Sequence, residues 1–245
     1  MDRKLTAALL GEGLGTFLFV FVGVGCIVLG GLTGTPSDLI GVALAHGITL
    51  AVVVTAFAAI SGGHINPAVT VALWVNGSID ALRAVLYIVA QLIGAVLGAV
   101  LIHLTFGDKA WLAAGYGKPS MMPGIDPTTG LVLEAAMTML LVAAVFFTAV
   151  DPRAAKLGGL LIGLSIVGDI LVGGPVTGAA MNPARWFGPA AAAGDFTNAY
   201  VWIVGPVLGG VVIALLYRFV FTPARPTSDA LARPEAAPAP QRVEA

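Results

Sequence analysis

Charged residues are scarce in this chain of 245 residues, since Asp, Glu, Lys and Arg together make up only 10% of it. A soluble globular domain carries about 25%, so the composition excludes an ordinary soluble protein. Hydrophobic residues make up 58%, and apolar runs of about twenty residues, enough to cross a bilayer, recur along the sequence. The chain is therefore predicted to be an all-α membrane protein. Its net charge of −1 gives no reason to expect a nucleic-acid partner.

Cysteine is almost absent as well. The single Cys26 lies in the first apolar run, so an intrachain disulfide is excluded. The three histidines are His46, His64 and His103, and their spacing is not that of a metal site. We therefore expect no metal and no other cofactor. Because no nucleophile stands in a pattern with a general base, we also expect no enzymatic activity.

Hydropathy predicts six full spans, at residues 6–31, 39–60, 81–105, 130–150, 157–173 and 199–221. Two further apolar segments, 66–76 and 182–193, are too short to cross. The long connection at 106–129 is predicted to be a Gly- and Pro-rich loop. Residues 1–221 are thus predicted to form one membrane domain made of two repeats, 6–105 and 130–221. Residues 222–245 are rich in Pro, Ala and charge and are predicted to be a disordered cytoplasmic tail.

Basic residues indicate the orientation in the membrane. All Lys and Arg residues except Lys109, Lys118 and Arg185 fall at the termini or in the connections that follow the second and fourth spans. Basic residues accumulate on the cytoplasmic side, so both termini are predicted to be cytoplasmic. We expect the plasma membrane as the location.

The triplet Asn-Pro-Ala occurs twice, 116 positions apart (182 against 66), as Asn66, Pro67 and Ala68 and as Asn182, Pro183 and Ala184. On a similar spacing, Glu12 in the first span matches Glu134 in the fourth. Each repeat contains three spans, an odd number, so the second repeat must be inverted relative to the first. Paired interrupted segments in inverted repeats indicate a transport site near the middle of the bilayer.

Each triplet has the pattern of a helix start, because Asn is a favoured N-cap and Pro is favoured at the first helical position. Inverted symmetry brings the two helix N-termini together near the membrane centre. The loops before them then supply pore-lining carbonyl oxygens, from Gly62, Gly63, His64, Gly178 and Ala180. Two N-termini place positive potential at the centre, which repels cations and protons while the Asn amides donate to a passing oxygen. This arrangement suits neutral polar molecules.

The stretches "SGGHINPAVT" and "GAAMNPARWFGPA" together resemble the major intrinsic protein family, the aquaporins and aquaglyceroporins. The resemblance covers residues 6–221. It implies six spans with two half-helices, a homotetramer with one pore in each subunit, and passive passage of water. It also implies an outer selectivity filter, formed here by His46, Ile170, Ala179 and Arg185. An arginine in hydrocarbon costs at least about 2.5–3.5 kcal/mol, which independently predicts that Arg185 faces a wet lumen.

This filter is more similar to that of the plant tonoplast intrinsic proteins than to that of orthodox water channels. The resemblance implies His46 as a hydrogen-bond donor, with ammonia, hydrogen peroxide and urea as further solutes beside water. Trp186 and Ile203 depart from the usual water-channel pattern, and Ile203 is more like glycerol facilitators. Asp169, next to Ile170, has two interpretations: tuning of the filter through His46 or Arg185, or a role at a helix end or loop.

Other functions remain open. A glycerol or urea facilitator of the same family differs only in the solutes that pass. An ion-coupled secondary transporter also uses inverted repeats and broken helices, and Glu12 and Glu134 are its candidate coupling groups. In a channel the same two carboxylates instead support the half-helix loops. A structural junction protein would pass no water at all.

Overall fold

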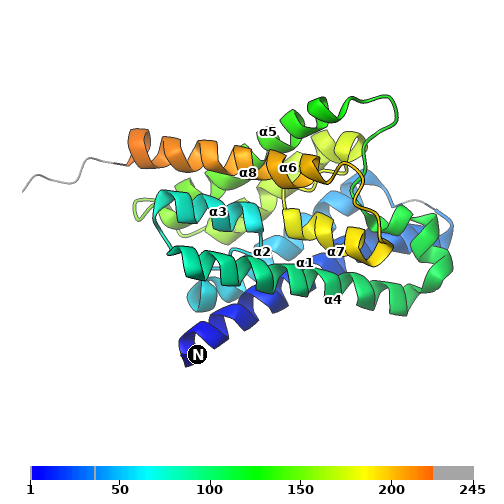
Figure 1. Ribbon diagram of the computed structural model, residues 1–245, viewed down its shortest axis with the longest axis horizontal. Helices are drawn as coiled ribbons and strands as arrows, with labels where there is room; N and C mark the ends of the chain where they lie inside the picture. The colour runs from blue at the N-terminus through cyan, green and yellow to red at the C-terminus, as the bar shows by residue number, and fades with distance from the viewer. Residues whose placement is uncertain (1, 36, 223–245) are drawn as a thin grey trace, which may run out of the picture.

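The computed structural model describes residues 2–35 and 37–222, so the predicted tail, apart from Thr222, lies outside the described residues. The helices, shown in Figure 1, are α1 (Arg3–Thr33), α2 (Leu39–Ser61), α3 (Pro67–Asn76), α4 (Ala81–Ala113), α5 (Pro127–Val145), α6 (Gly158–Thr177), α7 (Pro183–Ala193) and α8 (Ala199–Leu216). A short 3₁₀ turn, η1 (Gly115–Gly117), follows α4, and π-helical turns η2 (Phe146–Val150) and η3 (Tyr217–Phe221) extend α5 and α8. Within the described ranges there is no strand, and 6 helices are long and apolar enough to cross a membrane. The all-α prediction with six spans and two half-helices is confirmed.

The helix ends follow from short polar and glycine signals. Aspartate side chains accept the first free backbone N–H groups of four spans, at Asp2, Asp38, Asp80 and Asp126. Such N-caps satisfy donors that have no partner within the helix. Five helices end at a glycine in the left-handed conformation, at Gly34, Gly62, Gly77, Gly178 and Gly194. Glycine adopts this conformation without strain.

The predicted loop at 106–129 is wrong in its first third. The chain breaks its helical path at Gly107 (φ 77°, ψ 169°) and then resumes a helix as far as Ala113. The reason lies in Trp111, which is buried and stacks on His103 at a centroid distance of 5.4 Å. This contact holds the part of α4 after Gly107 against the part that precedes it.

The fifth span is also longer than predicted. Helix α6 continues to Thr177, through Pro175, and does not end at residue 173. The Gly-Gly-Pro stretch suggested an earlier end. A proline in the last turn removes one helical hydrogen bond, and Gly178 caps the helix directly afterwards.

The two repeats pack in the same way. Helix α1 lies along α4, and α5 lies along α8. A Cβ at Gly94 would overlap the carbonyl oxygen of Gly13, and a Cβ at Gly209 would overlap that of Ala135. Small residues let membrane helices approach closely, so both repeats use a glycine at the equivalent contact.

The two half-helices occupy opposite ends of the molecule. Figure 1 shows α3 toward one end and α7 toward the other, and α3 packs on α8 while α7 packs on α4. A cation stands at the C-terminal end of each. The Nη1 of Arg218 donates to the carbonyl oxygen of Val75 at 2.9 Å, and Lys118 forms an ion pair with Asp195, just past the end of α7. The Lys118 ammonium, followed by the backbone N–H of Thr197, holds the pKa of Asp195 below its usual value. Cations at helix C-termini are stabilising.

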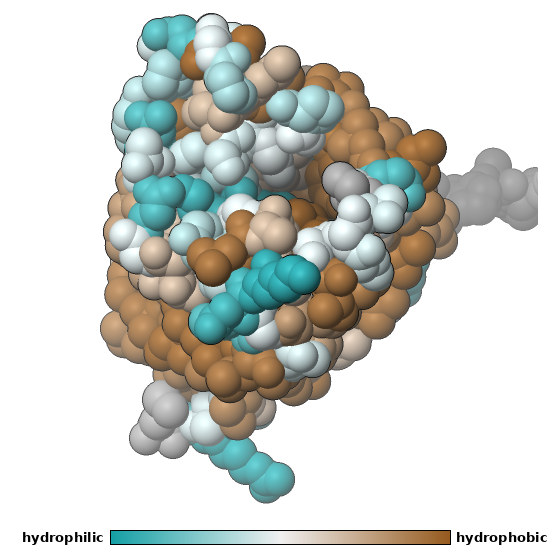
Figure 2. Space-filling view, turned by 90° about the vertical axis from the view of Figure 1, so that its right-hand side faces the viewer, coloured by the Kyte–Doolittle hydropathy of each residue, from teal (hydrophilic) through white to brown (hydrophobic). Residues whose placement is uncertain are grey.

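The surface fits a membrane environment. Large hydrophobic side chains on α1, α2, α4, α5, α6 and α8 are exposed. Figure 2 looks at the end that carries the connection from α4 to α5, where polar residues gather in the middle and hydrophobic residues form the surround. The chain is therefore an integral, multi-pass membrane protein.

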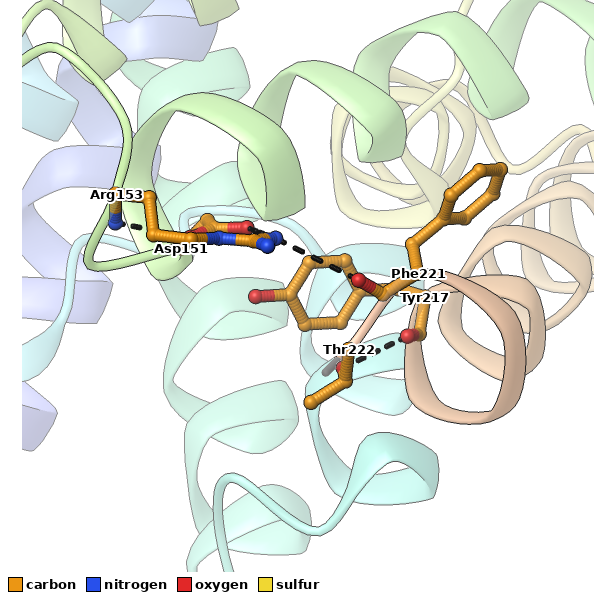
Figure 3. Close-up of polar contacts among 5 residues, drawn as sticks. All are labelled: Asp151, Arg153, Tyr217, Phe221 and Thr222. Atoms are coloured by element: carbon orange, nitrogen blue, oxygen red, sulfur yellow. Dashed lines mark hydrogen bonds and ion pairs between the residues drawn. The ribbon is translucent and has the colours of Figure 1, made fainter. Parts of the chain in front are cut away.

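At the opposite end, an arginine joins the connection between α5 and α6 to the end of α8 (Figure 3). The Nε and Nη2 of Arg153 donate to Asp151 at 2.8 and 2.5 Å, and Nη2 also donates to the carbonyl oxygen of Phe221 at 3.5 Å. The Oγ1 of Thr222 donates to the carbonyl oxygen of Tyr217 at 2.8 Å. The Arg153 guanidinium lowers the pKa of Asp151 to about 2. The carboxylate is therefore charged across the physiological pH range.

We predict that Gly94→Ala destabilises the protein, because the added methyl group meets the backbone of α1. Overpacking of this kind costs about 1–3 kcal/mol. Gly168→Ala is the matched control, since a Cβ at Gly168 in α6 has no neighbour within 4 Å. Thermal unfolding of the two detergent-solubilised variants measures the difference. Equal melting temperatures would contradict the close contact between α1 and α4.

Candidate functional site

The two half-helices meet through their N-cap asparagines. The Oδ1 of Asn66 accepts from the N–H of Ala68 in its own helix, and its Nδ2 donates to the carbonyl oxygen of Met181 at 2.9 Å. Asn182 repeats the pattern: Oδ1 accepts from the N–H of Ala184, and Nδ2 donates to the carbonyl oxygen of Ile65 at 2.9 Å. The predicted meeting of the N-termini inside the molecule is thus made by reciprocal hydrogen bonds. Each amide has two N–H groups, so one on each asparagine is left for another acceptor.

The residues just before the asparagines have unusual backbone conformations. Ile65 (φ 54°) and Met181 (φ 47°) are both in the left-handed region, as is Ala179 (φ 42°). For non-glycine residues this conformation costs about 1–3 kcal/mol and persists only where the surroundings impose it. Here it turns the carbonyl oxygens of Ile65 and Met181 toward the opposite asparagine.

Glu12 holds the first of these loops. Its Oε1 accepts from the Oγ of Ser61 at 2.6 Å and from the N–H of His64 at 2.9 Å. Its Oε2 accepts from the N–H of Ile65 and the Nε2 of Gln91, both at 2.7 Å. The carboxylate is fully buried, so four donors replace its hydration.

Glu134 holds the second loop in the equivalent way. Its Oε1 accepts from the Oγ1 of Thr177 at 2.7 Å and from the N–H of Ala180 at 2.9 Å, and its Oε2 accepts from the N–H of Met181 at 2.8 Å. Donors to a charged acceptor form strong hydrogen bonds. Both loops are therefore fixed by a carboxylate from the first helix of their own repeat.

Sequence reasoning missed an outer layer of support. The hydroxyl of Tyr87 donates to the carbonyl oxygen of Ser61 at 2.8 Å, and the Nε1 of Trp202 donates to that of Thr177 at 3.0 Å. Ser61 and Thr177 are 116 positions apart, like the asparagines. That spacing was a signal for the hydroxyl pair. Tyr87 and Trp202 are 115 positions apart, the same spacing as Gly94 and Gly209, so the repeat carried a weaker signal for the aromatic donors too.

The two loops that hold the predicted pore-lining carbonyls leave these oxygens without a protein donor in the part of the chain that the structure describes. No donor among the described residues reaches the carbonyl oxygens of residues 62–64 and 178–180. Of these residues, Gly63, His64, Ala179 and Ala180 are buried. Buried carbonyls are almost always hydrogen-bonded, to protein or to water. These oxygens therefore need water or a polar solute as partner.

A cavity of about 790 Å³ leads to this point from the end of the molecule that carries Asp151. Its walls include Gly62, Gly63, His64 and Asn66 at the inner end, and Asp151 at the rim. Hydrophobic side chains from α2, α3, α5 and α6 line the middle, among them Leu50, Val54, Val69, Leu141 and Ile162. The cavity thus joins one face of the molecule to the first asparagine.

Beyond the asparagines, Arg185 and His46 face each other. The Nδ1 of His46 lies 2.8 Å from the carbonyl oxygen of Val42, so this nitrogen carries the proton. Its Nε2 then accepts from the Nε and Nη2 of Arg185 at 3.3 and 3.2 Å. The expectation that His46 is a donor to solute is therefore wrong in this geometry, because the ring has no free N–H. The Nη1 of Arg185 has no partner among the described residues and is the available donor.

The other two predicted filter residues are apolar and buried: Ile170 lies on α6, and Ala179 lies in the second loop. Room for the His46 ring comes from α1, since a Cβ at Gly23 would overlap it and Phe19 packs edge-on against it at 5.7 Å. Of the four predicted filter residues, the structure joins His46 and Arg185 by hydrogen bonds, and a filter completed by Ile170 and Ala179 stays a prediction.

The sequence also singled out Asp169 and Ile203. Asp169 lies in the middle of α6, away from the helix ends, and no hydrogen bond joins it to His46 or Arg185 within the described chain. Ile203 is 42% exposed on α8. The neighbouring Trp202 points inward instead.

No residues suited to a resident metal gather in the ranges that the structure describes: no group of three His, Cys, Asp or Glu side chains lies together there. The buried carboxylates of Glu12 and Glu134 accept hydrogen bonds from the two loops. The chemistry of the site is that of hydrogen-bond donors and acceptors along a narrow path.

Comparisons with known proteins agree with this geometry. Residues 2–217 match the family model of the Major intrinsic protein family. The chain is 43% identical to Aquaporin TIP4-1 of Zea mays over 228 residues, which cover 90% of this chain and 88% of the relative. It is 42% identical to the probable aquaporin TIP3-2 of Arabidopsis thaliana over 230 residues, 89% of this chain and 84% of the relative.

A solved structure, the aquaglyceroporin from Plasmodium falciparum, is similar with a TM-score of 0.79 at 27% identity, covering 89% of this chain and 98% of that one. The family match and the tonoplast-type relatives confirm the resemblance seen in the two triplet motifs. This chain belongs to the major intrinsic protein family and is a membrane channel of that family.

Proposed function

We propose that the protein is a passive water channel that excludes protons and ions, and that admits ammonia, hydrogen peroxide and urea as further small neutral solutes. The observation that carries this proposal is the joint between Asn66 and Asn182. Each amide donates one N–H to a carbonyl oxygen of the opposite loop, and its second N–H is free to donate to a molecule in the lumen. A water oxygen that accepts from both has its hydrogens turned away from the centre, so it does not relay a proton across.

Electrostatics supports the exclusion of cations. The N-termini of α3 and α7 meet at the asparagines, while their C-terminal ends are matched by Arg218 and Lys118. The positive ends of both helix dipoles are therefore left facing the lumen. Half-helix dipoles and an arginine are known means of barring protons and cations from such pores. Arg185 supplies the arginine.

The glutamates argue against ion-coupled transport. A coupling carboxylate must release its partners to bind an ion or proton. Glu12 accepts from four donors and Glu134 from three, and each set includes two backbone N–H groups of a strained loop. Releasing them would free the loop that defines the pore. We therefore assign both residues a supporting role.

The solute range depends on the wall opposite Arg185. The side chains of Ile170 and Ala179 offer no hydrogen bonds there, which favours small neutral molecules over ions. The similarity to an aquaglyceroporin structure keeps a glycerol facilitator as the second candidate. The channel architecture is the same for both, so only flux measurements separate them.

We also propose a homotetramer with one pore per subunit and cytoplasmic termini, on the strength of the family resemblance and the distribution of basic residues. A plasma-membrane location was expected from the sequence. The tonoplast-type relatives weigh against it. Fractionation of cell membranes with an antibody to the chain decides the location.

The direct test is stopped-flow light scattering on proteoliposomes that contain the purified protein. Vesicles are shocked in parallel with an impermeant osmolyte, glycerol and urea, and an ammonium gradient is added with an internal pH dye. We expect fast shrinkage with a low activation energy and no re-swelling in glycerol. Rapid glycerol re-swelling would favour the facilitator. Water flux no faster than in empty liposomes would refute the channel.

We predict that Arg185→Val raises glycerol and urea permeability relative to water by about tenfold, because the filter loses its charged donor and gains width. Proton leakage, followed with a pH dye, is expected to rise as well. Arg153→Val is the matched control, since Arg153 lies at the rim of the other end. An unchanged solute profile for Arg185→Val would remove this residue from the filter.

Mercurial compounds are predicted to inhibit the channel weakly. The constriction position at which many family members carry cysteine is Ala179 here, and Cys26 lies on α1. Water flux is measured before and after treatment with mercuric chloride, for the protein and for Cys26→Ser. A strong block that a reductant reverses and that Cys26→Ser abolishes would contradict this prediction.

A further inference from the structure

The second repeat departs from the first at one place behind the filter. The spacing of 116 positions pairs Ser61 with Thr177, His64 with Ala180 and Thr70 with Trp186. Ser61 and Thr177 both carry a hydroxyl group, but in the other two pairs the large and the small side chain change places. A ring at position 64 and a small residue at 70 become a small residue at 180 and a ring at 186.

In the first repeat the ring belongs to the loop. The Nδ1 of His64 lies 3.1 Å from the Oγ1 of Thr70, and the His64 ring packs edge-on against Tyr87 at 5.0 Å. The hydroxyl of Tyr87 in turn donates to the carbonyl oxygen of Ser61. His64 also lines the cavity, so this ring narrows the lumen on its side of the asparagines.

In the second repeat the ring stands behind the loop. Trp186 is fully buried and stacks on Trp202 at 5.5 Å with an interplanar angle of 10°. The Nε1 of Trp202 donates to the carbonyl oxygen of Thr177, as Tyr87 does to that of Ser61. Trp186 and Ala180 belong to one packed cluster. The indole therefore fills the space that His64 and Thr70 fill together in the first repeat.

A short chain of contacts leads from this indole to the filter. Thr177, whose carbonyl oxygen is held by Trp202, accepts the N–H of Ala179 at its Oγ1 at 3.1 Å. The same hydroxyl donates to Glu134 at 2.7 Å. Ala179 is strained, at φ 42°, and directly precedes Ala180. The position of Ala179 thus depends on Thr177, whose carbonyl oxygen accepts a hydrogen bond from Trp202.

We propose that Trp186 is a positioning residue for the outer constriction. Its ring holds Trp202 against Thr177 and so fixes Ala179 opposite Arg185, while Ala180 leaves that side of the lumen without a ring. Solute selectivity then depends on the Trp186–Trp202 stack, although neither ring contacts the solute. This inference rests on the proposed channel function.

The contact that matters is the flat face of the indole. Its Nε1–H has no hydrogen-bond partner among the described residues. Phenylalanine can therefore stack on Trp202 as the indole does, whereas leucine is apolar but has no planar ring. The comparison separates stacking from simple filling of space.

The experiment compares Trp186→Phe and Trp186→Leu with the unmodified chain in proteoliposomes. The readout is the ratio of glycerol and urea permeability to water permeability, which does not depend on how much folded protein each vesicle holds. Trp111→Leu is the matched control, since it removes a buried, stacked indole outside the pore. We expect Trp186→Leu to raise the ratio by about tenfold, and Trp186→Phe and Trp111→Leu to leave it unchanged.

If Trp186→Leu carries no water, Trp202→Phe replaces it. That variant keeps a ring beside Trp186 but loses the donor to the Thr177 carbonyl, and the same rise in the ratio is expected. An unchanged ratio with normal water flux in the variant measured would overturn the positioning role and leave the channel function standing. Absence of water flux in the unmodified protein would refute the channel itself.

Discussion

Two buried carboxylates accepting hydrogen bonds from two loops are the interaction on which the pore depends. Irregular backbone in hydrocarbon leaves N–H groups that cost several kcal/mol each when unsatisfied. Glu12 and Glu134 accept these N–H groups and thereby leave the carbonyl oxygens of residues 62–64 and 178–180 free. One side of each loop is satisfied by protein, and the other side offers acceptors to water. The free carbonyl oxygens are the lining that we propose for the pore, and they are free because the N–H groups of the same loops are bound by the carboxylates.

The inverted repeat closes this arrangement at the centre. Asn66 and Asn182 each cap one half-helix and hold the opposite loop, so neither half is complete without the other. The glycines at 94 and 209 allow the same close helix contact in both repeats. We propose that selectivity depends on the places where the two repeats differ. His46 and Arg185 form a polar pair on one side of the joint, and a ring stands at His64 in the first loop but at Trp186 behind the second loop.

The sequence was informative wherever a pattern repeats or a composition is extreme. Span number, the two half-helices and the repeat followed from hydropathy and from the Asn-Pro-Ala spacing, because these features reflect backbone constraints of the membrane. The helix after Gly107 and the end of α6 were not predictable, since Trp111 packing and the Gly178 cap override local Gly and Pro signals. His46 was assigned as a donor, but its tautomer depends on the Val42 carbonyl, one helical turn away. Tyr87 and Trp202 act through tertiary contacts that carry no local signature.

A high-resolution structure of the protein in lipid, with ordered water resolved, tests the account most directly. We predict a single file of water density within hydrogen-bond distance of the carbonyl oxygens of residues 62–64 and 178–180. The file should pass between the free N–H groups of Asn66 and Asn182 and reach the Nη1 of Arg185. Carbonyl oxygens without water, or a file of water on another path through the helices, would contradict the account.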